Sequence, residues 1–427
     1  MSEEFLYFIW QNQLFNKKEL YTSDGEIIEV INSGTRNTDS GPDFFNAKIK
    51  IGETIWAGNV EIHVKSSDWY KHSHEKDKAY DSLILHVVNE NDKEVYNTQG
   101  IKLETAKILF DNKYLESYKE LLESKLWINC ENQINKVESI YINSWLNTLL
   151  VERLEQKSQV VKRILEKNKN DWEETLYQLV ARNFGLNTNS LPFELLAKSL
   201  PQKILAKHKN NILQIEALLF GQAGFLNDEL DDNYYNQLKV EYKILKQKYS
   251  LITLETHLWK FLRIRPSNFP TIRISQFANL IYKSVNLFSK ILETEKVSQI
   301  VDLLNVRASE YWNNHYQFGK TTDENETKSL GKSSIDIIII NSIVPLLFMY
   351  GKMRDNEGLC EQSLDFLNNI KAEKNNVISK WSEIGIKAEN AFDSQSLLQL
   401  KNSYCDKNEC LKCLIGNKII LNNATNN

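Results

Sequence analysis

The chain has 427 residues, of which 42% are hydrophobic and 25% are charged, and its formal net charge at pH 7 is −4. This composition excludes a disordered or fibrous protein and predicts two to three globular domains, each with its own core. The weakly negative charge excludes a uniformly basic nucleic-acid-binding chain, so contact with a polyanion would need a local basic patch.

The first residues, MSEEFLYFIW, are acidic where a secretory signal would be basic, so we expect no signal peptide. Residues 3–19 place their apolar side chains at helix-like spacings. The turn signal Asp24-Gly25 then precedes EIIEVI (27–32), which predicts a short strand.

Two further strands follow a loop that is rich in Gly, Ser, Asn and Asp. FNAKIKI (45–51) alternates apolar and polar residues. The alternation is clearest in NVEIHVK (59–65), where Glu61, His63 and Lys65 share one face. After a polar stretch, LILHVV (83–88) predicts an interior strand, and weaker strands are expected around 94–106. These elements predict a mixed α/β module over residues 1–112, in the order helix, three strands, short helical linker, strand.

Two acids of this module are candidate metal ligands. Asp43 begins one strand and Glu61 lies inside the next, with a turn near Gly52 between them. Because adjacent antiparallel strands lie about 4.8 Å apart, the two carboxylates are expected to share a divalent cation, Mg²⁺ or Mn²⁺. His63 or Lys65, on the same strand face as Glu61, would assist a reaction at a phosphoryl group.

Four of the seven histidines lie close to Glu61 in the sequence: His63, His72, His74 and His86. Histidines beside carboxylates suit Mn²⁺, Zn²⁺ or Fe²⁺, since imidazole favours transition metals. In the alternative interpretation, His72 and His74 lie on a polar loop and His86 is a hydrogen-bonded core residue. The carboxylates would then be surface acids, with Lys65 as a solvated partner.

The order of elements, with Pro42-Asp43 leading one strand and an acidic-x-basic triplet on the next, resembles the restriction-endonuclease-like PD-(D/E)xK nuclease superfamily. The resemblance implies that Asp43 and Glu61 bind metal and that a lysine assists phosphodiester hydrolysis. His63 stands at the position of that lysine here, and the nearest lysine is Lys65. The role has therefore moved to Lys65, or His63 serves it, or the site is degenerate and only binds.

The chain also resembles, nearly from end to end, an uncharacterised bacterial family known as a domain of unknown function. The resemblance rests on GPDF (41–44), VEIH (60–63), SSDW (66–69), LHVV (85–88), FGQAG (220–224), RPSNFPTIR (265–273) and CLKCLIG (410–416). It implies a shared architecture and no particular activity.

From about residue 112 the pattern becomes helical, and six prolines and fifteen glycines are few for the length of the chain. We therefore predict an all-helical region over residues 113–427 and an α+β chain overall. The most apolar stretch, 335–350, is interrupted by Asp336, Asn341 and Pro345, so we expect a buried helix or strand and no membrane span.

A segment of the helical region combines arginines with aromatic residues. WKFLRIRPSNFPTIR (259–273) contains Arg263, Arg265 and Arg273, and this combination suits phosphate contact and base stacking. The same segment would also serve as a loop between helices, with its arginines capping carbonyls or pairing with acids.

Three cysteines lie close together near the C-terminus in a C-x4-C-x2-C pattern: Cys405, Cys410 and Cys413. They supply three of the four ligands that a structural zinc ion or an iron–sulfur cluster needs, and Cys130 is the predicted fourth, with Cys360 as the rival. Some nucleases of the PD-(D/E)xK superfamily hold an iron–sulfur cluster by a similar cysteine arrangement. Reduced thiols without metal are the alternative, and five cysteines in so long a chain indicate the cytoplasm.

The sequence supports two hypotheses of function. The first is a metal-dependent nuclease-type phosphodiester hydrolase acting on DNA or RNA, with the helical region gripping the substrate. The second is a non-catalytic scaffold that binds nucleic acid or protein through a degenerate nuclease-like module. No motif for a small-molecule cofactor is recognised.

Overall fold

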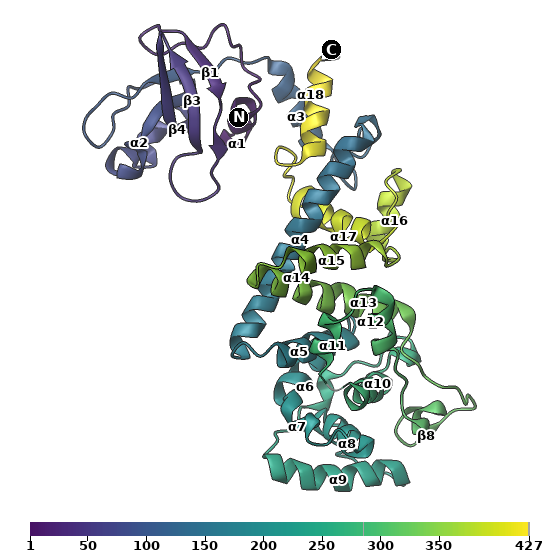
Figure 1. The fold of residues 1–427 in the computed structure, drawn as a ribbon. Helices are drawn as coiled ribbons and strands as arrows, with labels where there is room; N and C mark the ends of the chain where they lie inside the picture. Colours follow the sequence, from purple (N-terminus) through teal and green to yellow (C-terminus); the bar gives the residue numbers. More distant parts are fainter. Residues whose placement is uncertain (285, 426–427) are drawn as a thin grey trace. The chain divides into compact units, whose positions relative to one another are not determined.

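The computed structural model describes residues 1–284 and 286–425, and the chain divides into two compact units (Figure 1). Unit 1 comprises Met1–Trp145 and Leu400–Asn427, and unit 2 comprises Leu146–Gln399. The chain is α+β, because strands and helices occur in separate parts of it. Strands give way to helices near residue 112, where the sequence pattern changes, but unit 1 extends to Trp145 and includes the C-terminal segment.

Unit 1 is built on a six-stranded sheet within its described residues, with the order β1-β3-β4-β5-β6 and with β2 paired to β3. The strands are β1 (Ile28–Asn32), β2 (Thr35–Arg36), β3 (Phe44–Ile51), β4 (Thr54–Lys65), β5 (Leu83–Glu90) and β6 (Thr105–Lys107). Strands β1, β3 and β4 are antiparallel neighbours, whereas β5 joins β4 in parallel and β6 joins β5 in parallel.

A parallel pair of strands requires a crossover, and the polar stretch between β4 and β5 supplies it. This stretch forms α2 (Asp68–Lys71) and two 3₁₀ turns, His74–Lys76 and Lys78–Tyr80. The predicted order of helix, three strands, helical linker and strand is therefore found, with the two-residue strand β2 as an addition that was not predicted, and β5 is interior as predicted.

Helix α1 (Glu3–Gln11) is shorter than the helical pattern of residues 3–19 indicated. Ser2 caps its first turn by accepting a hydrogen bond from the backbone N–H of Phe5. The helix ends at Gln11 because Gln13 adopts a left-handed conformation, with φ of 51°. Residues Phe5–Trp10 are all buried, so this one helix presents apolar side chains on nearly every side.

Strand β4 is buried on both of its faces in the segment Val60–His63. Helices α1 and α2 both contact β4, which explains why neither face reaches solvent there. The polar face of the alternating pattern, which carries Glu61 and His63, therefore lies inside unit 1.

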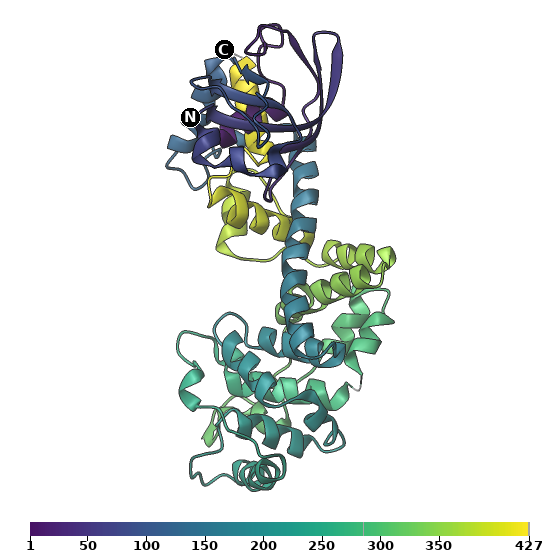
Figure 2. The ribbon, with the colours of Figure 1, turned by 90° about the vertical axis from the view of Figure 1, so that its left-hand side faces the viewer.

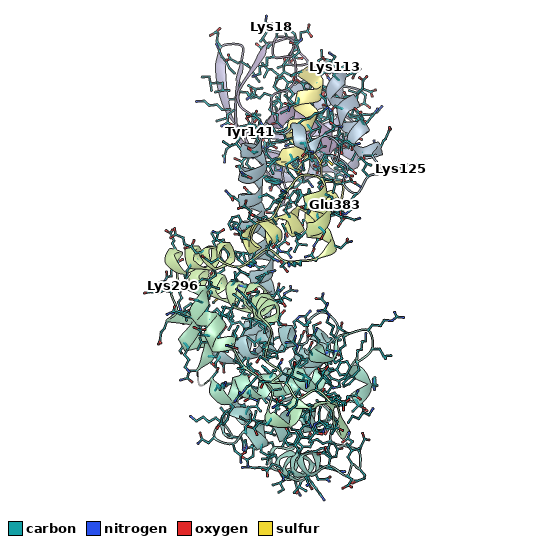
Figure 3. The ribbon with its side chains drawn as sticks, turned by 90° about the vertical axis from the view of Figure 1, so that its right-hand side faces the viewer. Lys18, Lys113, Lys125, Tyr141, Lys296 and Glu383 are labelled. Carbon is teal, nitrogen blue, oxygen red and sulfur yellow. The ribbon has the colours of Figure 1, made fainter. Side chains whose placement is uncertain are left out.

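The helical part of unit 1 consists of α3 (Asn112–Glu123), the start of α4 (Ser139–Lys167) and α18 (Leu414–Thr425). The C-terminal helix α18 packs against α3, and the two lie side by side in Figures 1 and 3. In Figure 2 the C-terminal helix α18 is drawn in yellow, and it belongs to the same unit as the strands. The first and last segments of the chain are thus parts of one compact unit.

Unit 2 is mostly helical, and helices far apart in sequence surround one extended apolar core. Its helices after α4 are α5 (Trp172–Phe184), α6 (Ser190–Ser199), α7 (Gln202–Ala206), α8 (Ile212–Gln222), α9 (Asn233–Tyr249), α10 (Pro270–Lys283), α11 (Leu287–Leu292), α12 (Val297–Leu304), α13 (Lys332–Ile338), α14 (Val344–Met353), α15 (Glu357–Asn368), α16 (Asn376–Glu383) and α17 (Ala391–Gln399).

The prediction of an all-helical region needs one correction, since β7 (His315–Gln317) and β8 (Lys320–Thr321) form a hairpin. Gly319 turns this hairpin with φ of +66°.

The most apolar helical segment of the chain is Lys332–Met353, which contains α13, a π-helical turn and α14. Among the described residues it is the one helix with the length and composition to cross a membrane. Of its most apolar 18-residue window, 78% is buried inside the protein. The predicted buried element over 335–350 is therefore a core helix.

Candidate metal centre

The register of the sheet brings the two predicted acids together. Phe44 lies opposite Val60 on the antiparallel pair β3–β4, so Asp43 comes next to Glu61. The backbone N–H of Asp43 donates to Glu61 Oε2 at 3.0 Å, and the N–H of Ile62 donates to Asp43 Oδ2 at 2.9 Å. The two carboxyl groups also share a hydrogen bond.

Two histidines lie beside the free oxygen of Glu61, and a third histidine lies beside them. Glu61 Oε1 lies 3.3 Å from His74 Nε2 and 3.7 Å from His63 Nε2. His63 Nε2 and His72 Nδ1 are 3.1 Å apart, and one nitrogen of each of the three rings lies within 4.8 Å of the others. Two neighbouring ligand atoms that bind one ion at ~2.1 Å are about 3.0–3.4 Å apart. The His63–His72 and Glu61–His74 distances fall in this range, and the other donors lie slightly further apart.

We refer to Asp43, Glu61, His63, His72 and His74 as the histidine–carboxylate cluster. Its members differ in exposure: His63 is 1% exposed and Glu61 is 5% exposed, whereas His72 lies at the surface. A cation held here would be enclosed by protein on the side of the sheet and open to solvent on the side of His72.

The imidazole of His63 is in the protonation state that binds a cation, whereas the carboxyl groups would have to lose a proton first. Burial raises the pKa of Glu61 to about 8, and burial with the charge of Glu61 raises the pKa of Asp43 to about 7. Burial, followed by the neighbouring His86, His74 and His72, lowers the pKa of His63 to about 2. A neutral imidazole keeps a lone pair for a metal ion, and a bound cation favours ionisation of the carboxyl groups.

His86 on β5 orients the ring of His63. Its Nε2 lies 2.8 Å from His63 Nδ1, and both side chains are buried. For His63 Nε2 to bind a cation, the proton of His63 must sit on Nδ1 and be donated to His86 Nε2. The sequence analysis counted His86 among the candidate ligands. In the structure His86 contacts the ring of His63 on the side that faces away from the converging donor atoms.

Two residues of α1 also reach the cluster, and the sequence analysis missed them. The hydroxyl of Tyr7 is hydrogen-bonded to the carboxyl of Asp43. Burial raises the pKa of Glu3, which also interacts with His72 and Asp43. A polar residue every four positions in an otherwise apolar, buried helix was the available signal, because positions i and i+4 share one helix face.

A family model described as protein of unknown function (DUF2851) matches residues 3–376. The chain belongs to this family. No curated protein and no solved structure matches it. The matched segment of the DUF2851 protein contains the whole histidine–carboxylate cluster and ends before Cys405.

Lys65 of the DUF2851 protein lies away from the converging donors. Its Nζ is 2.9 Å from Glu90 Oε2 on β5, and its side chain is 45% exposed. The carboxyl group of Glu90 raises the pKa of Lys65. The residue that stands next to Glu61 and the metal-ligand atoms is therefore His63.

The predicted arginines are divided between a groove and the core of unit 2. Arg263 and Arg265 are exposed and line a groove of about 1290 Å³. Arg273 is 4% exposed and donates to Asn268 and Ser334, so it stabilises the interior. We refer to this groove as the basic groove, because its basic residues are Lys157, Arg163, Lys167, Arg182, Lys198, Arg263 and Arg265, against the single acid Glu194.

Part of this positive charge is already paired within the protein. Arg182 and Lys198 both form ion pairs with Glu194, and Lys157 is buried, with hydrogen bonds to Asn341 and Gln395. The remaining basic side chains of the groove have no acidic partner among the lining residues. The groove therefore presents a net positive surface.

Proposed function

We propose that this DUF2851 protein is a metal-dependent hydrolase of phosphodiester bonds in nucleic acid, with the histidine–carboxylate cluster as its catalytic metal centre. One observation carries the proposal. One nitrogen of each of His63, His72 and His74 lies within 4.8 Å of the others, Glu61 Oε1 lies 3.3 Å from His74 and 3.7 Å from His63, and the carboxylate of Glu61 accepts from the N–H of Asp43.

The strand topology supports the nuclease assignment. A helix, three antiparallel strands, a helical crossover and a parallel strand follow one another, as in the restriction-endonuclease-like superfamily that the sequence resembles. Asp43 stands at the start of the second long strand, and Glu61 stands inside the third. Fold alone does not assign a function, so the argument depends on the donors that these strands position.

The donors favour a transition-metal ion over Mg²⁺. Mg²⁺ prefers oxygen ligands, whereas three imidazoles and a carboxylate suit Mn²⁺, Zn²⁺ or Fe²⁺. We expect Mn²⁺ to support activity better than Mg²⁺, although the sequence allowed either ion.

The residues of the cluster have distinct tasks in the proposed reaction. When bound, a divalent cation acidifies an attacking water and neutralises charge that develops on the phosphoryl oxygens. Glu61 and the imidazoles of His63, His72 and His74 would hold the cation. Asp43 is oriented by Tyr7 and by the N–H of Ile62, and its carboxylate, beside Glu61, would accept the proton of the water.

The basic groove supports a polyanionic substrate. Exposed Arg163, Arg263 and Arg265 line it without acidic partners among its lining residues, and arginine forms bidentate contacts with phosphate. The overall charge of the chain is negative, so this local surface is where a nucleic-acid backbone would bind. Such a substrate agrees with the predicted cytoplasmic location.

One observation favours the alternative function, a non-catalytic nucleic-acid-binding protein. His63 occupies the place of the superfamily lysine and is uncharged, so it cannot supply positive charge to a phosphoryl group. If the cation does not replace that charge, the site binds without cleaving.

Cleavage assays separate the two functions. The full chain is incubated with single- and double-stranded DNA and RNA in Mn²⁺, Mg²⁺ or Zn²⁺. We expect cleavage that falls by at least about 100-fold in Glu61→Gln and in Asp43→Asn. Glu53→Gln is the matched control, because Glu53 is an exposed acid in the turn between the same two strands. Binding without cleavage in every metal would overturn the hydrolase and support the alternative.

The basic groove is tested by binding instead of cleavage. Replacing Arg263 and Arg265 together by glutamine should weaken nucleic-acid binding about equally for all sequences. The slope of log K against log salt concentration should also become shallower, by roughly one for each phosphate contact that is lost. Lys296→Gln is the control, since Lys296, labelled in Figure 3, is exposed and does not line the groove. Equal losses in the control and the double variant would show that the groove has no special role.

A further inference from the structure

Four of the five cysteines come together in unit 1, although they are far apart in the sequence. Cys130 lies in the segment between α3 and α4. Cys405 ends a π-helical turn, Leu400–Cys405, and Cys410 and Cys413 precede α18. Cys360 lies on α15 of unit 2, where its thiol donates to the carbonyl of Phe348 at 3.7 Å. We refer to Cys130, Cys405, Cys410 and Cys413 as the cysteine cluster.

Direct contacts hold the Cys130 segment against the C-terminal segment. The side-chain amide of Asn129 donates to Asn408 Oδ1 at 2.9 Å and to Cys410 Sγ at 3.6 Å. Asn423 on α18 donates to Gln133 Oε1 at 2.8 Å. These contacts fix Cys130 beside the three clustered cysteines.

The four thiols form one electrostatic group. Burial, with the neighbouring Cys413 and Cys410, raises the pKa of Cys130 to about 12. Burial raises the pKa of Cys413 to about 11, and it raises the pKa of Cys405 still further, with Cys413, Cys130 and Cys410 as additional causes. The thiols of Cys130, Cys405 and Cys413 are thus close enough to other cysteines of the group to interact with them, and Cys413 is buried.

The backbone around Cys413 is arranged to stabilise a thiolate. The N–H groups of Ile415 and Gly416 donate to the sulfur of Cys413. The chain can turn this tightly because residue 416 is glycine: a Cβ there would lie 2.3 Å from the carbonyl oxygen of Cys410. Amide donors to a cysteine sulfur stabilise its charged form and are a recurrent feature of metal–thiolate sites.

We propose that Cys130, Cys405, Cys410 and Cys413 form a four-thiolate metal centre, separate from the histidine–carboxylate cluster. The spacing of the sulfurs favours an iron–sulfur cluster. A single zinc ion with Zn–S bonds of ~2.3 Å holds its sulfurs about 3.8 Å apart. Among the described residues, ring nitrogens of His63, His72 and His74 lie within 4.8 Å of one another. No three cysteine sulfurs in the described part of the chain lie that close together. A cluster of several irons holds its thiolates further apart than one ion does.

The centre would have a structural role. It would tie the C-terminal segment, which includes α18, to the segment after α3, and its binding energy would contribute to the folding of unit 1. The proposal does not rest on the hydrolase function, because it concerns other residues and is tested by metal content.

Metal analysis of the full chain, purified without oxygen, tests the proposal. We expect iron and acid-labile sulfide, up to about four of each per chain, with broad absorbance near 400 nm. Cys413→Ser and Cys130→Ser should lose both, and Cys360→Ser should retain them as the matched control. About one zinc ion per chain, lost in the same variants, would support the four-thiolate centre and overturn the iron–sulfur assignment.

X-ray absorption of the wild-type protein covers the case in which the serine variants fail to fold. Metal with sulfur neighbours supports the centre, whereas metal with only nitrogen and oxygen neighbours belongs to the histidine–carboxylate cluster and overturns it. Wild-type protein without metal also overturns it. Each of these results leaves the cleavage assays to decide the hydrolase proposal separately.

Discussion

The histidine–carboxylate cluster and the cysteine cluster lie in the same compact unit but are built on different kinds of backbone. The first stands on β3, β4 and the crossover to β5, whose register is fixed by strand pairing. The second stands on turns and loops before α4 and α18. Pairing between strands fixes Asp43, Glu61 and His63 of the first site, whereas the backbone hydrogen bonds around the cysteines are local to each of two segments that are far apart in the sequence.

This difference teaches that the two sites should respond differently to the loss of metal. A site on paired strands is preorganised, so its metal contributes chemistry more than stability. A site on loops that joins distant segments depends on its metal for structure. The predictions below test this contrast, from the largest expected effect to the smallest.

Loss of the four-thiolate centre should destabilise the protein more than any loss at the histidines. We expect Cys413→Ser to lower Tm by at least about 5 °C, since a lost structural metal costs several kcal/mol and each kcal/mol shifts Tm by about 2–4 °C. His72→Ala, at an exposed ligand of the other site, should change Tm by less than about 2 °C. Calorimetry compares the two variants, and equal losses would contradict the contrast.

The hydrogen bond from His63 to His86 should set the affinity of the histidine–carboxylate cluster for its cation. His86→Leu removes the acceptor, so Mn²⁺ affinity should fall by about 10–100-fold in isothermal titration calorimetry. His86→Gln keeps an acceptor oxygen and should lose less. If leucine and glutamine weaken binding equally, His86 acts by packing and does not orient His63.

The raised carboxyl pKa values should make the metal-free protein less stable at higher pH. Burial raises the pKa of Asp43 to about 7 and that of Glu61 to about 8 in the folded state, above unfolded values of about 4. Their stabilising contribution therefore falls as the pH rises above about 4 and is fully lost once the pH has passed the folded-state pKa values. Below about pH 6.5 the lowered pKa values of His63 and His86 act in the opposite direction.

Comparison of wild type with Asp43→Asn between pH 6.5 and 8.5 isolates this effect. The contributions of other groups, such as Lys157 with its pKa lowered to about 7, cancel in the difference. The stability of wild type should fall relative to the variant by up to about 1.4 kcal/mol per pH unit, measured by urea unfolding with a chelator present. Saturating Mn²⁺ should abolish the difference in slope, and parallel curves without metal would contradict it.

The smallest effect is expected at Lys65. Its partner is the exposed Glu90, so Lys65→Met should leave cleavage within about two-fold of wild type. A large loss of cleavage with unchanged Mn²⁺ binding would show that Lys65 performs the task of the superfamily lysine, and that it leaves Glu90 when substrate binds.

The sequence was most informative where a local pattern sufficed. Alternation predicted β4, the apolar run 83–88 predicted an interior strand, and the apolar stretch 335–350 predicted a core element. The strand order also followed, because short connections make consecutive strands neighbours and a helical linker permits a parallel pair. The hairpin β7–β8 was missed because it depends on a single glycine turn within a mostly helical region.

The candidate site was less accessible to sequence analysis than the fold. The pairing of Asp43 with Glu61 follows from the register of β3 and β4, and two alternating segments joined by a turn were enough to predict it. Glu3 and Tyr7 reach the same site from α1, and only the packing of that helix on the sheet brings them there. Arg273 was grouped with Arg263 by sequence, yet Arg273 lies on the buried helix α10 and Arg263 lies in the exposed segment before it.

The sequence by itself determined the identity of the donors and the periodicity of the strands that carry them, because both depend on neighbouring residues along the chain. The tertiary structure alone decided that the polar face of β4 is enclosed, that His86 supports His63, and that Cys130 meets three cysteines from the other end of the chain. Those arrangements depend on contacts between segments tens or hundreds of residues apart, which no local pattern encodes.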